Sequence, residues 1–478
     1  MSAPFEALDA HVRRVWDDDI VPALFEYIAN PCVSEMFDPQ WREHGHLHRA
    51  VDQIQAWCAA RAVAGLTVEV VELDGRTPVI LCEVPAFDPT GVITASPGDT
   101  VLLYGHCDKQ PEMTGWREGL GPWTPVLEGD RLYGRGGADD GYAAFASLLA
   151  IEAAQLAGLA HTRLVVLIEA GEESGSPDLP AYIDHLADRI GPVSLVVCLD
   201  SGCMDHERLW VTTSLRGMVA GTLRVEVLTE GVHSGEASGV VPSSFRVIRQ
   251  LLDRLEDPAT GRILVPELHL EVPADRYAQA AQTAEEFTVG EHYPFAGATL
   301  PMTDDPTEQL LARTWTPTLS VTGVAGIPPV ESAGNVLRPF TTLMLSFRIP
   351  PTCDPERAAA AVAERLTTDP PSGATVTWTP QGSAPGWNAP TFAPWLDRGL
   401  AEASAQTFGR EHGAFGEGGT IPFMGMLGAR FPEAQFVITG VLGPGSNAHG
   451  PNEYIQLPTA RRITSCIALL LQSHATRA

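Results

Sequence analysis

Short apolar segments alternate with longer helical segments between residues 98 and 200, and this alternation constrains the fold more than any other feature of the chain. The pattern predicts strands over 100–104, 163–169 and 194–199, and helices over 141–156 and about 179–189. Such alternation is typical of a parallel sheet covered by helices. We therefore expect an α/β fold with a mostly parallel sheet.

Polar residues follow three of the predicted strands, at 105–108, 169–173 and 200–202. In open α/β sheets the ligand crevice lies beyond the carboxyl ends of the strands. The three polar segments should therefore lie close together at one edge of the sheet.

The order of the predicted elements changes after about residue 214. Strands are predicted over 218–228, 318–322, 340–348 and 375–379, and helices over 242–255 and 355–366, with a long irregular insertion at about 256–316. This β-α-β-β-α-β order is the ferredoxin-like pattern. After 386 the chain returns to α/β style, with a helix near 395–408, a strand at 435–442 and a helix near 459–473. We expect a catalytic domain of residues 1–213 and 387–478, interrupted by a ferredoxin-like α+β lid at 214–386.

The charge of the chain excludes some partners. With 31 basic and 59 acidic residues, the formal net charge of −28 repels phosphate backbones and anionic lipid headgroups. The sequence therefore argues against nucleic acid and membrane surfaces as partners. The N-terminal residues are charged and no run of 18 apolar residues occurs, so a cytoplasmic location is expected.

Acidic residues gather at the predicted sheet edge together with His106. Alone, each has an ordinary interpretation as a helix cap or a solvated turn. Together, Asp139, Asp200, Glu172 and Glu173 would repel one another, and divalent cations are the simplest remedy. A paired site uses a bridging carboxylate to hold two ions about 3.5–4 Å apart. The neighbours Glu172 and Glu173 offer one metal ligand and one carboxylate free to accept a proton from water.

Eight segments then resemble a known family. In order they are LLYGHCDKQP, LYGRGGADDG, EAGEESGSP, VVCLDSG, TEGVHSG, LSFRIPP, GEGGTIPF and NAHGPNEY, spread over residues 102–454. They resemble the two-metal aminoacylase, carnosinase and cytosolic nonspecific dipeptidase family of metallopeptidases. The resemblance implies two divalent ions per subunit, with zinc expected and manganese accepting the same ligands.

The resemblance also implies a role for individual residues of the metal site. One ion would be held by His106, Asp139 and Asp200, and the other by Asp139, Glu173 and His449. Glu172 would be the general base, and Asp108 would orient His106. A cis peptide bond between Asp139 and Asp140 is implied as well.

Substrate contacts are implied on the lid. His233 resembles a histidine that reaches into the site of the other subunit of a homodimer and stabilises the oxyanion. Arg348 and the turn from Gly416 through Gly418 and Gly419 to Thr420 resemble groups that hold the substrate carboxylate. Asn335 resembles a further substrate contact.

The activity implied is hydrolysis of the peptide bond in dipeptides or very short peptides. The length of 478 residues and the long insertion favour the dipeptidase branch. An N-acyl amino acid amidohydrolase is the nearest alternative. A non-catalytic metal or peptide binder is a different class of alternative, which the presence of Asp108 and Glu172 disfavours because neither would bind metal.

Two further features invite functional interpretations. Lys109 is the only lysine in the chain and stands where the family commonly has an apolar residue, which suggests a role near substrate or a carboxylate, with chance retention as the alternative. Gly141 likewise replaces a common lysine. The histidines His44, His46 and His48 are expected to lie on the surface rather than to form a metal site.

Overall fold

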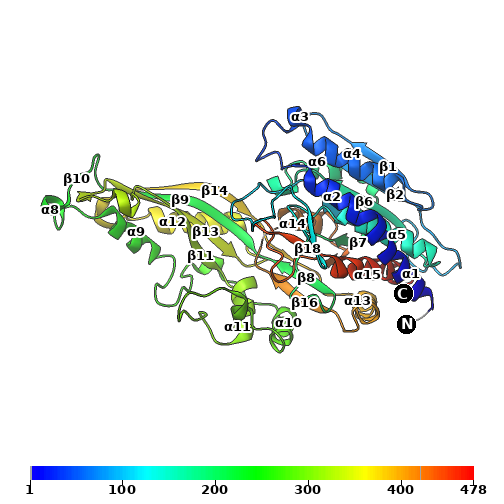
Figure 1. Ribbon diagram of the computed structural model, residues 1–478. Helices are drawn as coiled ribbons and strands as arrows, with labels where there is room; N and C mark the ends of the chain where they lie inside the picture. The colour runs from blue at the N-terminus through cyan, green and yellow to red at the C-terminus, as the bar shows by residue number, and fades with distance from the viewer. Residues whose placement is uncertain (1–2, 420, 478) are drawn as a thin grey trace. The chain divides into compact units, whose positions relative to one another are not determined.

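The computed structural model describes residues 3–419 and 421–477, which form two compact units (Figure 1). The first unit runs to Thr212 and also contains Ala389–Phe415 and the segment from Met426 onward. The second contains Thr213–Asn388 and Gly416–Gly425. These divisions fall within two residues of the expected boundaries, but Gly416–Gly425 belongs to the second unit although the sequence predicts it in the first.

A six-stranded sheet organises the first unit, in the order β1-β2-β6-β3-β7-β17. The strands are β1 (Thr67–Val71), β2 (Val79–Val84), β3 (Thr100–His106), β6 (Arg163–Glu169), β7 (Val193–Cys198) and β17 (Gln435–Ile438). β6, β3, β7 and β17 pair in parallel, whereas β1 and β2 are antiparallel additions at one edge. The prediction of a mostly parallel sheet is confirmed.

Helices cover this sheet because its central strands are apolar on both faces. Every residue of β3 is buried. The flanking helices include α1 (Ala3–Val15), α2 (Val21–Ala29), α4 (His46–Ala59), α5 (Ala143–Leu156), α6 (Leu179–His185), α7 (Ala187–Ile190), α13 (Pro394–Thr407) and α15 (Leu457–Ala475). α15 packs against both α5 and α13, so the N-terminal and C-terminal segments of the first unit share one hydrophobic core.

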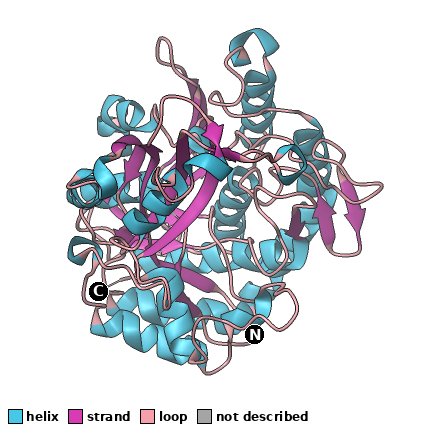
Figure 2. Ribbon diagram, turned by 90° about the vertical axis from the view of Figure 1, so that its left-hand side faces the viewer, coloured by secondary structure: helices cyan, strands magenta, loops and turns pink. Residues whose placement is uncertain are grey.

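The second unit contains an antiparallel sheet in the order β11-β13-β9-β14. Its elements are β9 (Gly217–Glu226), α9 (Ser244–Leu252), β11 (Thr318–Ala325), β13 (Phe340–Ile349), α12 (Pro355–Thr367) and β14 (Thr375–Ala384). This is the predicted ferredoxin-like order. Buried and half-buried residues alternate along β13, so one face of the strand packs against the helices. In Figure 2 strands are magenta and helices cyan.

The insertion at 256–316 is not irregular as predicted. It contains α10 (Ala274–Ala284) and α11 (Pro306–Thr314). The side chain of Asp305 accepts the main-chain N–H groups of Thr307 and Glu308, and Pro306 occupies the first helical position. This start signal is local and polar, whereas the prediction relied on apolar periodicity. Among the described residues, no helix is long and apolar enough to cross a membrane.

Candidate active site

The carboxyl ends of the parallel strands carry the predicted metal ligands of the first unit. β3 ends at His106, and Asp200 follows β7. Glu173 lies in a short 3-10 turn (Glu172–Ser174) after β6, and Asp139 precedes α5. His449 comes from the loop between β17 and β18 (Tyr454–Gln456). Chain segments far apart in sequence thus meet at one sheet edge.

His106, Asp139 and Asp200 form the first ligand group, and all three are buried. His106 Nε2 lies 3.5 Å from Asp139 Oδ1 and 3.7 Å from Asp200 Oδ2. Two ligands that share one tetrahedral ion at about 2.1 Å are roughly 3.4 Å apart, so these spacings suit a common ion.

Asp139, Glu173 and His449 form the second group. His449 Nε2 lies 3.0 Å from Asp139 Oδ2 and 3.4 Å from Glu173 Oε2. Asp139 therefore offers one oxygen to each group, which is the arrangement expected of a bridging carboxylate.

Two buried atoms test whether a cation fits here. His106 Nε2 and Glu173 Oε1 are buried without a hydrogen-bond partner among the described residues. Buried polar atoms are normally satisfied, and both atoms carry lone pairs suited to zinc or manganese. The residues present therefore fit divalent metal ions.

Asp108 contacts both sides of this site. His106 Nδ1 lies 3.2 Å from the Asp108 main-chain oxygen and 3.4 Å from Oδ1, so its N–H faces Asp108 and Nε2 is left for a metal. The same carboxylate accepts the main-chain N–H groups of Glu172 at 3.1 Å and Glu173 at 2.9 Å. Asp108 thus positions the Glu172–Glu173 turn as well as His106, a role that the sequence did not suggest.

Burial and mutual repulsion control the protonation of the carboxylates. Burial raises the pKa of Glu172 and of Glu173 well above the ordinary range, with additional repulsion from neighbouring carboxylates. Burial alone would lower the pKa of His106, but Asp108 and Asp139 outweigh it and raise that pKa. Burial and repulsion therefore disfavour the charged forms of both glutamates, and a bound cation would favour them.

The predicted cis peptide bond between Asp139 and Asp140 is present.

Sequence reasoning missed several groups around the ligands. Gln110 Nε2 donates to Glu173 Oε2 at 2.6 Å. Arg135 and Glu453 form a buried ion pair beside the His449 loop. Both residues lie within the family-like segments, but their pairing leaves no local sequence signal.

One interpretation placed Lys109 near substrate or a carboxylate, but within the described residues its ammonium donates to main-chain oxygens instead of a carboxylate. Lys109 is fully buried, and its Nζ donates to the main-chain oxygens of Tyr27, Ile28 and Asn30 at 2.7, 3.4 and 2.9 Å. The ammonium also lies 3.9 Å from the centre of the Tyr27 ring. Lys109 therefore caps the C-terminal end of α2, where a cation is favoured by the helix dipole.

The predicted substrate contacts belong to the second unit. His233 ends β10 (Val232–His233), which pairs with β12 (Val336–Leu337), and Asn335 accepts the main-chain N–H of Ser234 at 3.0 Å. His233 and Asn335 therefore lie side by side along this ribbon, and both are exposed. Arg348 is half-buried on β13, and burial lowers its pKa.

Arg216, between β8 (Trp210–Leu215) and β9, holds the glycine turn and was not predicted. Its Nε donates to the Gly418 oxygen at 3.2 Å, and its Nη1 to the Thr318 hydroxyl at 3.3 Å and to the Ala312 and Thr316 oxygens at 3.4 Å. Burial, with repulsion from other arginines, lowers the pKa of Arg216 to about 10.

The glycines of the turn differ in how closely they are packed. Thr318 pairs directly with Arg348, so Arg216 links the turn to the β13 arginine. A side chain at Gly416 would meet Ser214 Oγ at 2.5 Å, whereas Gly419 faces open space. Thr420 lies outside the described residues.

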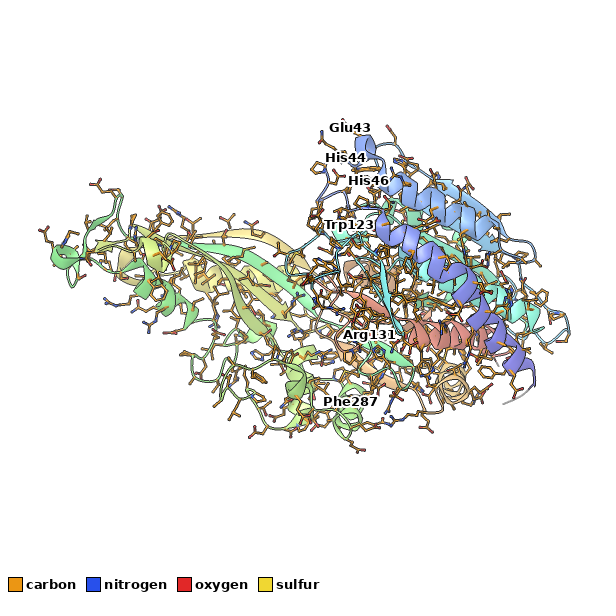
Figure 3. All side chains as sticks on the ribbon, in the orientation of Figure 1. Glu43, His44, His46, Trp123, Arg131 and Phe287 are labelled. Carbon is orange, nitrogen blue, oxygen red and sulfur yellow. The ribbon has the colours of Figure 1, made fainter. Side chains whose placement is uncertain are left out.

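Of the three histidines near α3 (Trp41–His44), His44 is exposed as expected, whereas His46 and His48 are half-buried. His44 lies 2.9 Å from Asp38, and His48 lies 3.4 Å from Glu72. Figure 3 shows His44 and His46 at α3 and the start of α4, next to Glu43.

The fold and the paired ligand groups define a metal-dependent hydrolase of the α/β class. The sequence profile of "Peptidase family M20/M25/M40" matches residues 102–473. The chain belongs to this peptidase family, and the predicted family and enzyme class are confirmed.

Curated relatives of this chain are dipeptidases by name. The cysteinylglycine-S-conjugate dipeptidase of Corynebacterium striatum is 26% identical over 363 residues, covering 74% of this chain and 77% of that protein. The human Beta-Ala-His dipeptidase is 27% identical over 331 residues, covering 67% of this chain and 62% of that protein. The resemblance to the dipeptidase branch thus extends to relatives with different named substrates.

Solved structures share the fold. The dipeptidase Dug1p from Saccharomyces cerevisiae superimposes with a TM-score of 0.78 at 22% identity, with 99% of each chain covered. Human carnosine dipeptidase 1 gives a TM-score of 0.76, also at 22% identity and with 99% of each chain covered. The similarity extends over both units of the chain.

Proposed function

We propose that this chain is a metal-dependent dipeptidase that hydrolyses the peptide bond of dipeptides or very short peptides. The observation that carries the proposal is the shared position of Asp139 in two ligand groups, with Glu172 adjacent and outside both. The dipeptidase names of the curated relatives support the substrate class.

Two divalent ions per subunit would be held by these groups, with zinc the first candidate and manganese the second. When bound, such ions polarise a carbonyl and lower the pKa of water toward neutrality. The spacing of His106, Asp139 and Asp200, and that of Asp139, Glu173 and His449, supports this assignment.

Glu172 would move the proton. Its main-chain N–H is held by Asp108, so the turn that presents it is fixed. Burial raises the pKa of Glu172, which makes its carboxylate a stronger proton acceptor than an ordinary glutamate. Glu172 would take a proton from the attacking water and deliver it to the leaving amine.

The second unit would bind and orient the substrate. Arg348 and the turn containing Gly416, Gly418, Gly419 and Thr420 would hold the carboxylate of the substrate, with Asn335 as a further contact. His233 would stabilise the oxyanion in the site of the partner subunit. The first unit would then be the catalytic domain and the second the lid and dimerisation domain.

Exposed apolar side chains support a homodimer formed through the second unit. Val240 and Val330 are 84% and 86% exposed, and β11 lies at the edge of its sheet with Val321 and Val324 exposed. Exposed apolar patches and open strand edges are common features of association surfaces. The cytoplasmic location stays a prediction.

Replacing Glu172 tests the function. Glu172→Gln should keep its metals by elemental analysis and lose about 10²–10⁴-fold in the hydrolysis of Ala-Ala or Leu-Gly. Glu43→Gln, on the exposed surface of α3, is the matched control and should retain activity.

Two results would contradict the proposal. Undiminished turnover by Glu172→Gln would exclude Glu172 as the base. Faster hydrolysis of N-acetyl amino acids than of dipeptides, in protein supplied with zinc or manganese, would favour an N-acyl amino acid amidohydrolase.

A further inference from the structure

A buried ion pair joins the two loops that present Asp139 and His449. Arg135 Nη1 lies 2.5 Å from Glu453 Oε2, and their side chains are 1% and 0% exposed. Arg135 precedes Asp139 by four residues, and Glu453 follows His449 by four. Neither residue belongs to a ligand group. The pair is therefore beside the proposed metal site without being part of it.

Several further bonds of each partner cross to the opposite loop, while Arg135 Nε donates to the Pro111 main-chain oxygen at 3.3 Å. Arg135 Nη2 donates to the main-chain oxygens of His449 at 2.9 Å and Gly450 at 3.0 Å. Glu453 Oε1 accepts the main-chain N–H of Gly136 at 2.9 Å, and the Glu453 main-chain oxygen accepts that of Gly134 at 3.0 Å. A planar guanidinium can make these bonds together, whereas an ammonium cannot. The pair thus ties both loops together by backbone and side chain.

The His449 loop needs such support. His449 has a φ of 60°, and Asn447 and Asn452 have φ values of 55° and 63°. Residues other than glycine rarely adopt this left-handed backbone conformation, and they keep it only where surrounding contacts impose it. The bond from Arg135 to the His449 oxygen acts on the residue whose ring completes the second ligand group.

We propose that Arg135 and Glu453 are positioning residues that hold His449 in place for the Asp139–Glu173–His449 group. The His106–Asp139–Asp200 group contains no residue of the His449 loop and should depend on the pair much less. This inference rests on the proposed function, since it assumes that both groups bind metal. It predicts that disturbing the pair weakens one metal position selectively. A pair that only stabilised the fold would affect both positions alike or neither.

The test measures zinc binding directly. Glu453→Gln keeps the shape of the side chain and removes its charge, and Arg135→Lys keeps the positive charge beside Glu453 but cannot reach both carbonyls. Each variant should bind one zinc equivalent as wild type does and the other about 10- to 100-fold more weakly in a chelator competition. Since Arg135→Lys leaves the Glu453 charge compensated, it decides the question if Glu453→Gln does not fold.

Glu83→Gln is the matched control. Glu83 accepts hydrogen bonds from Arg163 at 2.8 Å and Arg189 at 3.0 Å, at the opposite end of the strands from the ligands. The Glu83→Gln variant should have a lower melting temperature and still bind two zinc equivalents tightly. Two tight zinc equivalents in a folded Arg135→Lys variant would overturn the inference and leave the proposed function standing. A wild-type protein that binds no zinc or manganese would instead contradict the proposed function itself.

Discussion

The carboxylate of Asp108 accepts the main-chain N–H of Glu173 at 2.9 Å, although Asp108 itself belongs to neither ligand group. The same side chain faces Nδ1 of His106 at 3.4 Å. One residue therefore sets the orientation of a ligand from β3 and of the turn that follows β6. Its contribution should be visible without any change in the ligands themselves.

Asp108→Asn should lower metal affinity or activity by about 10- to 100-fold, because groups that orient metal ligands have effects of that size. Steady-state kinetics together with a zinc titration would measure both. Asp188→Asn, on the exposed surface of α7, provides the control and should behave as wild type. Wild-type kinetics in the Asp108→Asn variant would contradict a role for Asp108 in the site.

Asp139 and Asp200 should differ in how much metal their replacement removes. Asp139 belongs to both ligand groups, whereas Asp200 belongs to one. We expect Asp139→Asn to lose both metal equivalents and Asp200→Asn to lose one, as measured by elemental analysis after gel filtration. Equal losses in the two variants would contradict a bridging role for Asp139.

Arg216→Lys should impair substrate binding more than turnover. The lysine keeps a positive charge but cannot make all the bonds from the guanidinium to Gly418 and the end of α11. Losing bonds worth about 1 kcal/mol each should raise KM roughly tenfold. The exposed Arg249 of α9, replaced by lysine, is the control. A change in kcat alone, with KM unaltered, would argue against positioning of the turn.

Hybrid dimers test the trans action of His233. His233→Ala and Glu172→Ala proteins should each be nearly inactive, because each lacks one essential group. After subunit exchange, a hybrid contains one site with both groups intact, so part of the activity should return. Exchange demonstrated by differently tagged subunits without any return of activity would show that His233 does not act across the dimer.

His474 should make the first unit less stable in acid. Its ring contacts the Thr162 hydroxyl at 3.2 Å and the Ser194 hydroxyl at 2.9 Å, and burial, followed by repulsion from Arg477, lowers its pKa to about 3. The unfolded chain therefore binds the proton more readily, and stability falls as the pH drops below about 6.5. At pH 5 this residue alone should lower the free energy of unfolding by about 2 kcal/mol.

Denaturant unfolding at pH 7 and pH 5 would measure this effect. In His474→Gln the loss of stability between the two pH values should be smaller by that amount. His185→Gln, on an exposed part of α6, should retain the full loss. An identical pH dependence in wild type and His474→Gln would contradict the assignment.

The main sheet, and the positions of His106 and Asp200 at its edge, could be predicted because these signals are local. The buried strands are uninterrupted apolar segments, and His106 and Asp200 stand at or just after the strand ends. β1 and β2 were missed. β1 is a half-exposed edge strand without an uninterrupted apolar run, whereas β2 is as buried and apolar as the predicted strands and was overlooked although its signal is local. The Arg135–Glu453 pair joins residues 318 positions apart, so no periodicity or motif spacing indicates it.

The burial of Lys109 has a practical consequence. A lysine-specific protease has a single possible cleavage position in these 478 residues. That position is buried at the C-terminal end of α2, where the Lys109 ammonium donates to three main-chain oxygens. Cutting requires the chain around β3 and α2 to open first. The rate of digestion by such a protease would therefore report how often this part of the protein opens, without any engineered probe.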